Sequence, residues 1–116
     1  MEAIKPEFQL PVATVLINRK IALMTRPGEP FVEFQMNWRD RCPVPAAFLV
    51  GYTNGYFCYF PTIAAAAIGV YGAASASTWA EPGAGERMVD HAVVKIHEML
   101  GQMTELPDDL KRDVYK

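Results

Sequence analysis

The chain has 116 residues and a mass of 12.9 kDa, which is enough for one domain and too little for two. Hydrophobic residues make up 51% of it and charged residues 21%, a balance typical of a folded chain with a core and unlike disordered, collagen-like or coiled-coil sequences. Its 11 basic and 13 acidic residues give a net charge of −2. The positive field that binds a phosphate backbone is missing, so nucleic acid is not an expected partner.

The cysteine content and the N-terminus bear on the cellular compartment. Cys42 and Cys58 are too few for a disulfide scaffold or a cysteine-based zinc site, and leave one bridge or two free thiols open. Residues 1–7 mix charges with a proline and contain no apolar run after a basic cluster, so the sequence predicts no signal peptide. The cytoplasm is therefore the default expectation.

The pattern of residues 10–25 predicts a β-hairpin. Residues 10–17 are rich in Val, Leu, Ile and Thr, and a second apolar run covers residues 21–25. Between them lie three polar residues, a stretch of the length of a tight turn. Pro27 and Gly28 then end the second strand.

A short helix and a third strand are expected next. Phe31, Phe34 and Trp38 recur at helical spacing, and Pro30 suits the first turn of a helix. Residues 46–52 form a continuous apolar run, which is typical of a strand covered on both faces. Strand, helix and strand in this order predict an α/β fold.

The most unusual segment is residues 42–80, which contain no charged side chain. Its longest run of small apolar residues, 63–76, is shorter than the roughly 20 residues that span a bilayer, and prolines, glycines and four tyrosines interrupt the segment. We therefore predict no transmembrane span. We expect a core segment that also forms the wall of a cavity, where tyrosine and asparagine side chains find buried partners.

The last part of the chain predicts the clearest helix. Apolar residues recur at helical spacing from Met88 to Leu100, charged residues occupy the other faces, and Gly101 ends the pattern. His91 and His97 lie six residues apart on this helix, so they face different directions and are expected to be ordinary surface histidines rather than a metal pair. Residues 107–116 are highly charged and predict a surface turn or a frayed end.

Two features are candidates for chemistry. The turn of residues 26–30 places Glu29 at the C-terminal end of a strand and the start of a helix, where ligands of α/β sheets usually bind. The alternative is that its charge only favours the helix N-terminus. The loop of residues 51–62, which also follows a strand, presents three tyrosines and Asn54 in an uncharged setting. Together the two features outline a pocket that contains a carboxylate.

These motifs resemble the neutral ceramidase family, zinc-dependent amidases that cleave the N-acyl bond of ceramide, and in particular its bacterial ceramidase-like members. The resemblance runs in order from about residue 10 to residue 100. It includes Pro27-Gly28-Glu29-Pro30-Phe31, then Gly51-Tyr52-Thr53-Asn54-Gly55-Tyr56 with Tyr59 and Pro61-Thr62, then Gly69-Val70-Tyr71, and Pro82-Gly83-Ala84-Gly85-Glu86.

The resemblance implies roles for individual residues. Glu29 and Tyr59 correspond to zinc ligands, and Tyr71 to the tyrosine that hydrogen-bonds the scissile carbonyl. Asn54 and Tyr56 are expected to line the substrate pocket. A zinc ion with one open position would activate a water and polarise the amide oxygen, and a nearby tyrosine hydroxyl would stabilise the oxyanion. An apolar wall around the site would suit a lipid-like amide.

The chain also departs from the family. The two remaining zinc ligands of the family are histidines upstream of the part that this chain resembles, and His91 and His97 do not match them. The acidic residue that usually follows the position of Tyr71 is Gly72 here, and residues 63–67 replace an acidic stretch. The chain resembles the C-terminal part of the catalytic domain and supplies two of four expected zinc ligands, which leaves open whether it is an enzyme by itself.

The sequence thus predicts one partial α/β domain over residues 1–116, with a strand hairpin, a short helix, a central strand and a C-terminal amphipathic helix in a larger mixed sheet layered with helices. The expected function is that of a fragment or subunit of a zinc-dependent amidase-type hydrolase acting on ceramide-like lipids. Zn²⁺ is the expected cofactor, and a partner chain or a homo-oligomer would complete the domain. The alternative is a non-catalytic α/β module for binding or oligomerisation. Members of the family are often secreted or membrane-associated.

Overall fold

The computed structural model describes residues 9–74 and 76–103. In chain order they form β1 (Ala13–Ile17), β2 (Ile21–Thr25), β3 (Glu29–Pro30), α1 (Val32–Arg41), β4 (Ala46–Val50), β5 (Tyr59–Phe60), α2 (Ile63–Ile68) and α3 (Ala84–Met99). A three-stranded sheet has the order β1-β2-β4, with β1 antiparallel and β4 parallel to β2. A second sheet pairs β3 with β5 in parallel. The predicted α/β class is confirmed.

The β1–β2 hairpin forms as predicted, with a shorter first strand. Asn18 and Arg19 make the turn at φ angles of 50° and 56°, and Lys20 N donates to Ile17 O at 3.0 Å. Strand β1 begins at Ala13 rather than at residue 10, because Pro11 has no amide hydrogen to contribute to a strand ladder.

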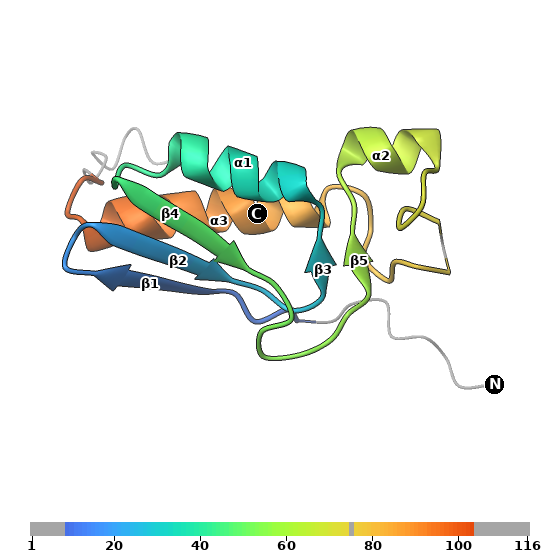
Figure 1. Ribbon diagram of the computed structural model, residues 1–116, viewed down its shortest axis with the longest axis horizontal. Coiled ribbons are helices and arrows are strands. Elements are labelled where there is room, and N and C mark those ends of the chain that lie inside the picture. The colour runs from blue at the N-terminus through green and yellow to red at the C-terminus, as the bar shows by residue number, and fades with distance from the viewer. Residues whose placement is uncertain (1–8, 75, 104–116) are drawn as a thin grey trace, which may run out of the picture.

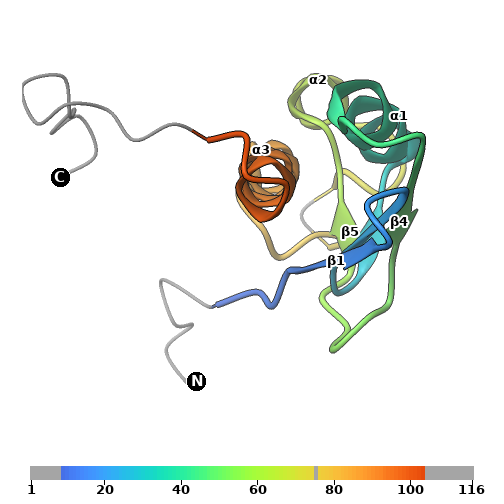
Figure 2. The ribbon, with the colours of Figure 1, turned by 90° about the vertical axis from the view of Figure 1, so that its left-hand side faces the viewer.

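Helices α1 and α3 contact each other and cover one face of the three-stranded sheet (Figures 1 and 2). Trp38 of α1 is fully buried there, and its indole Nε1 donates to Phe48 O at 3.1 Å. The ring of Phe34 lies against Gly85 of α3, where a Cβ atom would be 2.3 Å from it. The other buried side chains of this core include Ala22, Met24, Ala47, Met88, Val89, Ala92, Val93 and Ile96.

Strand β4 is covered on one face, not on both as its continuous apolar run predicts. Phe48 and Val50 point away from the helices and are exposed, because within the described residues no layer packs on that face. The outer edge of β4 is nevertheless protected: Gln35 Nε2 donates to Ala47 O at 3.0 Å, and Leu49 N donates to Gln35 Oε1. The side-chain amide of Gln35 takes the place of a neighbouring strand.

The predicted C-terminal helix is confirmed as α3, and its apolar face lies in the core. His91 is exposed on it, while the His97 Nδ1 atom lies 2.8 Å from Gln102 Oε1. The predictions for residues 1–7 and 107–116 fall outside the described residues.

The uncharged segment, residues 42–80, lies partly at the surface, which differs from the predicted core segment. Helix α2 consists of Ile and Ala alone and buries none of its residues. Thr62 caps its N-terminus, where the Thr62 Oγ1 atom accepts a hydrogen bond from Ala65 N at 3.0 Å, and Gly69, with a φ of 80°, caps its C-terminus. The segment is exposed because β3 and β5 have two residues each and offer no broad sheet to pack against.

None of the helices in the described part of the chain combines the length and the apolar character needed to cross a membrane.

Candidate functional site

The turn after β2 brings Glu29 next to Tyr59. Strand β3 pairs in parallel with β5, so that Glu29 and Tyr59 are partners in the register and their side chains share a face. Glu29 N donates to Cys58 O at 2.8 Å, and Phe31 N donates to Phe60 O at 3.1 Å. Two residues that are thirty positions apart in the sequence are thus placed side by side by backbone pairing.

Gly28 permits this close pairing. Its φ is 77°, and a Cβ atom at this position would lie 2.5 Å from Cys58 O and 2.8 Å from the Phe60 ring. A residue with a side chain would therefore be strained and would also push β5 away. The close pairing of β3 with β5 therefore explains why a glycine occupies this turn, which its position in the sequence alone does not explain.

Arg26 anchors the same turn in the core. Its side chain is fully buried, with the guanidinium carbon 4.9 Å from the centre of the Phe34 ring and 5.3 Å from that of Phe60. Its Nη2 donates to Gly85 O at 3.2 Å. Burial lowers the pKa of Arg26 to about 10, against the opposing attraction of Glu86. Arg26 therefore ties the end of β2 to α1, β5 and α3.

The loop after β4 adds Tyr52, one of the three tyrosines noted in residues 51–62, for which the sequence indicated no role of its own. Hydrogen bonding with Glu29 first, then desolvation and the charge of Glu29, raises the pKa of Tyr52 to about 12. Positive φ angles occur at Tyr52 (51°), Asn54 (62°) and Cys58 (54°), so this one loop contains three strained residues. In the sequence, the signal for Tyr52 was its position at the end of the predicted strand of residues 46–52.

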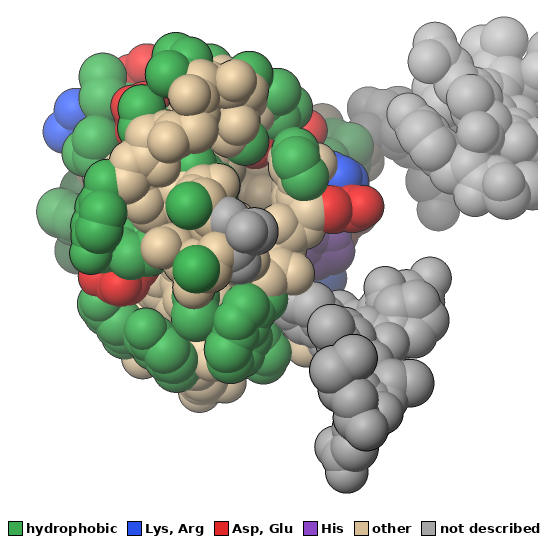
Figure 3. Space-filling model, turned by 90° about the vertical axis from the view of Figure 1, so that its right-hand side faces the viewer, with side chains coloured by type: hydrophobic (Ala, Val, Ile, Leu, Met, Phe, Trp, Pro, Cys, Tyr) green, Lys and Arg blue, Asp and Glu red, His purple; other side chains and the backbone are tan. Residues whose placement is uncertain are grey.

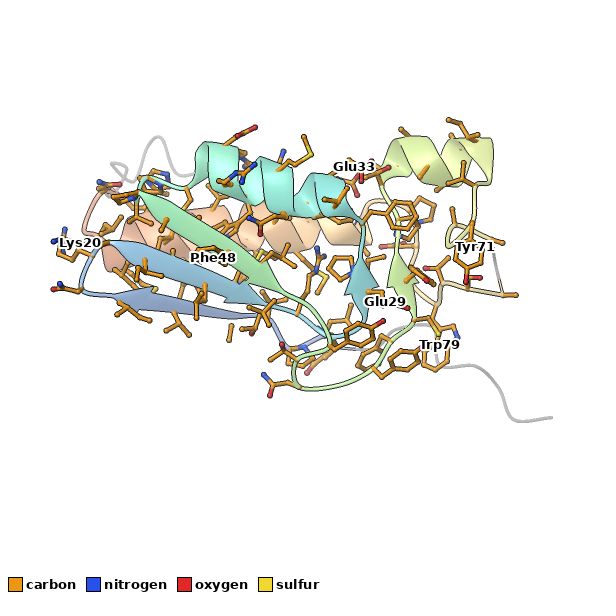
Figure 4. All side chains as sticks on the ribbon, viewed as in Figure 1. Lys20, Glu29, Glu33, Phe48, Tyr71 and Trp79 are labelled. Carbon is orange, nitrogen blue, oxygen red and sulfur yellow. The ribbon has the colours of Figure 1, made fainter. Side chains whose placement is uncertain are left out.

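Tyr71 completes the cluster from the far side of β5. Its ring lies edge-on to Tyr59, with centroids 5.7 Å apart. A hydrogen bond with Tyr71, followed by desolvation and the charge of Glu29, raises the pKa of Tyr59 to about 12. Figure 4 shows Glu29 and Tyr71 on the ribbon beside β5. The structure thus brings together Glu29, Tyr59 and Tyr71.

Gly72 lies against two rings. A Cβ atom there would be 3.1 Å from Phe31 and 3.2 Å from Tyr59, and the φ of Gly72 is 84°. Phe31 itself packs edge-on to Tyr59, with centroids 6.2 Å apart. In this arrangement the aromatic packing of Tyr59 occupies the space that a side chain at position 72 would need.

The two residues predicted for a substrate pocket, Asn54 and Tyr56, are exposed on the same loop. The Tyr56 ring stacks on Tyr52 at 6.1 Å between centroids, and the charge of Cys58 is the first cause that raises the pKa of Tyr56. Two hollows in the structure lie elsewhere. One of about 330 Å³ is lined by Leu10, Val12, Ala84, Arg87, Met88 and His91, and one of about 270 Å³ lies between α1 and α3.

The surface around the cluster is apolar. The side chain of Ile68 is 77% exposed and that of Tyr71 is 84% exposed, and Trp79 packs edge-on to Phe57 while remaining largely exposed. In the view of Figure 3, hydrophobic side chains gather over this end of the molecule and charged side chains lie toward its rim. Exposed apolar side chains grouped at one end of a molecule are a feature of interaction and ligand sites.

The donor set for a metal is incomplete. Glu29 and Tyr59 offer one carboxylate and one phenol oxygen, whereas a catalytic zinc takes three protein ligands. His91 and His97 lie on α3 outside this cluster. Across residues 9–74 and 76–103, no group of three or more His, Cys, Asp and Glu side chains is arranged to hold a metal ion. Within the described residues, Glu29 and Tyr59 by themselves do not make up a zinc site.

Comparison of the chain with family models, curated proteins and solved structures finds no match.

Proposed function

We propose that this chain is part of a zinc-dependent hydrolase of amide bonds in ceramide-like lipids. In this function Glu29 and Tyr59 bind the metal, and the Tyr71 hydroxyl donates a hydrogen bond to the carbonyl of the bound amide. Zn²⁺, when bound, would lower the pKa of a water molecule and polarise the amide oxygen. The remaining ligands would come from a partner chain or from a second copy of this chain.

One observation carries the proposal. Glu29, Tyr59 and Tyr71 come from three separate segments and converge into one cluster, through the register of β3 with β5 and the edge-on contact between the rings of the two tyrosines. Tyr52 lies close enough to Glu29 for the carboxylate to raise the pKa of the Tyr52 hydroxyl. Convergence of these residue types is what a site for metal binding and oxyanion stabilisation requires.

The surroundings support a lipid-like substrate. No charged residue occurs in residues 42–80, and the exposed side chains of α2, Tyr71 and Trp79 flank the cluster. Contact with such side chains would remove the apolar surface of an acyl chain from water, at little cost from the desolvation of polar groups. The Tyr71 hydroxyl, being exposed, is accessible to the carbonyl of a bound amide.

The alternative is a non-catalytic binding or oligomerisation module. It is favoured by the donor set, which within the described residues stops at two oxygen ligands. The two functions differ in one measurable property: a half-site binds Zn²⁺ more tightly when the missing ligands are supplied, and a plain scaffold does not.

The test is a calorimetric Zn²⁺ titration with and without imidazole, which stands in for the two histidines. We expect weak binding by the chain alone and binding at least about tenfold tighter with imidazole, since each additional group bound to the metal contributes strongly to affinity. Glu29→Gln and Tyr59→Phe remove one donor each and should abolish the gain. Glu33→Gln and Tyr56→Phe are matched controls, because they alter an exposed carboxylate and a neighbouring exposed tyrosine.

If imidazole leaves the affinity unchanged, or if the control variants lose the gain as fully as Glu29→Gln, the zinc site is wrong and the non-catalytic module stands. If the gain appears and depends on Glu29 and Tyr59, hydrolysis of N-acyl lipids by the reconstituted site is the next measurement.

A further inference from the structure

The side of the three-stranded sheet turned away from α1 and α3 is an apolar face. Alternate residues of the three strands point to it in register, three from each strand. They are Ala13, Val15, Ile17, Ile21, Leu23, Thr25, Ala46, Phe48 and Val50. Figure 2 shows both long helices on the other side of the strands, and Figure 4 labels Phe48.

No polar group on this face needs water. Thr25 is its sole residue with a polar side chain, and Ala13 N donates to Thr25 Oγ1 at 3.3 Å. The hydroxyl of Thr25 in turn donates to Ala13 O at 3.5 Å. The five largest exposed side chains on the face are between 37% and 53% exposed, so the surface is apolar and loses little by desolvation.

We infer that this face binds the same face of a second copy of the chain, sheet against sheet, around a two-fold axis that lies between the two sheets, over β2 and parallel to the strands. Two sheets packed in this way keep their strand directions within about 30° and lie about 10 Å apart. The axis places β2 opposite β2 and β1 opposite β4 of the other copy.

The distribution of small and large side chains favours a second copy as the occupant. In the register, Ala13 shares a row with Val50, Val15 with Phe48, and Ile17 with Ala46. The two-fold axis therefore sets a small side chain of one copy against a large one of the other at both ends of the strands. Leu23 lies near the axis and meets its own counterpart. A surface that is complementary to itself in this way forms a closed dimer.

The size of the face sets the strength of the dimer. The exposed parts of the five largest side chains amount to roughly 400 Å² a copy, if each whole side chain presents about 150–200 Å². This is within the range of the largest apolar patches on monomers, about 300–600 Å², and about half of what each partner buries in a standard interface. The dimer is therefore reversible and depends on protein concentration.

The test is sedimentation equilibrium of the full chain over a wide range of concentrations, without added metal. We expect a monomer–dimer equilibrium that Phe48→Arg weakens by at least about tenfold. The matched control is Met36→Arg on α1, because Met36 is 50% exposed and Phe48 is 53% exposed. The circular dichroism spectra of both variants should match that of the wild-type chain, which checks that the variants are folded.

A mixing experiment tests the arrangement itself. Val15→Glu and Phe48→Arg should each be monomeric, and an equimolar mixture should recover dimer, because Val15 of one copy meets Phe48 of the other. The inference is overturned if the wild-type chain stays monomeric at all concentrations, if Met36→Arg weakens the dimer as much as Phe48→Arg, or if the mixture stays monomeric. None of these results depends on zinc, so they are distinct from a failure of the proposed function.

Discussion

Two regions of this molecule are built in different ways. The layered region, β1, β2 and β4 with α1 and α3, buries alternate strand residues under two helices, with Trp38 and Ile96 fully inaccessible. The site region, β3 and β5 with residues 51–58 and α2, has strands of two residues and exposes most of its large side chains. The first is held by burial of apolar surface, and the second by backbone hydrogen bonds, glycine geometry and the anchor of Arg26. The polar cluster therefore lies in the exposed region, where the packing of a core places fewer constraints on the side chains.

The largest effect is expected in the layered region. Trp38→Ala should lower the free energy of unfolding by about 3–5 kcal/mol, because it leaves a cavity and removes the hydrogen bond to Phe48 O. Trp79→Ala, at an exposed position that packs against Phe57 of the site region, should cost less than about 1 kcal/mol. Urea unfolding followed by circular dichroism measures both. Equal losses would mean that the two regions share one core.

The site region should break at Gly28. Gly28→Ala should cost about 1–3 kcal/mol and speed hydrogen exchange of the Glu29 amide, because the new Cβ atom would push Cys58 O away. Gly69→Ala is the control: its φ of 80° imposes a similar strain, but no atom lies within 4 Å of its Cβ position. If both variants lose the same stability, backbone strain alone explains Gly28, and the close pairing of β3 with β5 is not needed.

The charge of Glu29 should be visible in the titration of Tyr52. A neighbouring carboxylate disfavours the phenolate, so Glu29→Gln should lower the pKa of Tyr52 from about 12 toward the ordinary value of about 10. The absorbance of tyrosinate against pH, in the presence of a chelator, measures the shift, and Tyr52→Phe identifies the component that moves. Glu33→Gln should leave the titration unchanged. An unchanged curve for Glu29→Gln would separate Tyr52 from the cluster.

The smallest effect is expected on α2. Ile68→Ser should change the stability by less than about 0.5 kcal/mol, since Ile68 is almost free of packing contacts. The same substitution at Ile96, in the core, should cost several times more, at roughly 2–5 kcal/mol. Thermal unfolding monitored by circular dichroism compares the two. A large loss at Ile68 would show that α2 is covered in solution.

Much of the layered region was predictable from local patterns. The hairpin, the helix with Phe34 and Trp38 on its buried face, and the C-terminal helix each follow from apolar spacing within one segment. Two features were not predictable. The run of residues 46–52 carries the apolar pattern of a strand with two covers, and α2 carries an alanine run without a buried face. In both segments the apolar composition indicates burial. Whether a second layer covers them depends on the rest of the fold.

For the candidate site, the sequence assigned roles to Glu29, Tyr59 and Tyr71, noted Tyr52 only as one of three loop tyrosines, and gave no role to Arg26. Glu29 and Tyr59 followed a strand end and a resemblance in motifs, whereas the hydrogen bond of Tyr52 depends on a backbone turn at positive φ. Arg26 looks like an ordinary charged residue at a strand end. Its burial between two phenylalanine rings from distant segments has no local signal.

Short-range periodicity and composition are enough to predict the α/β class, the order of the main elements and the uncharged segment of residues 42–80. The tertiary structure alone decided that Glu29 lies beside Tyr59, that one face of the sheet is open, and that Gln35 covers the edge of β4. These features arise from pairings between residues far apart in the chain, and a local pattern contains no information on the register in which distant segments meet.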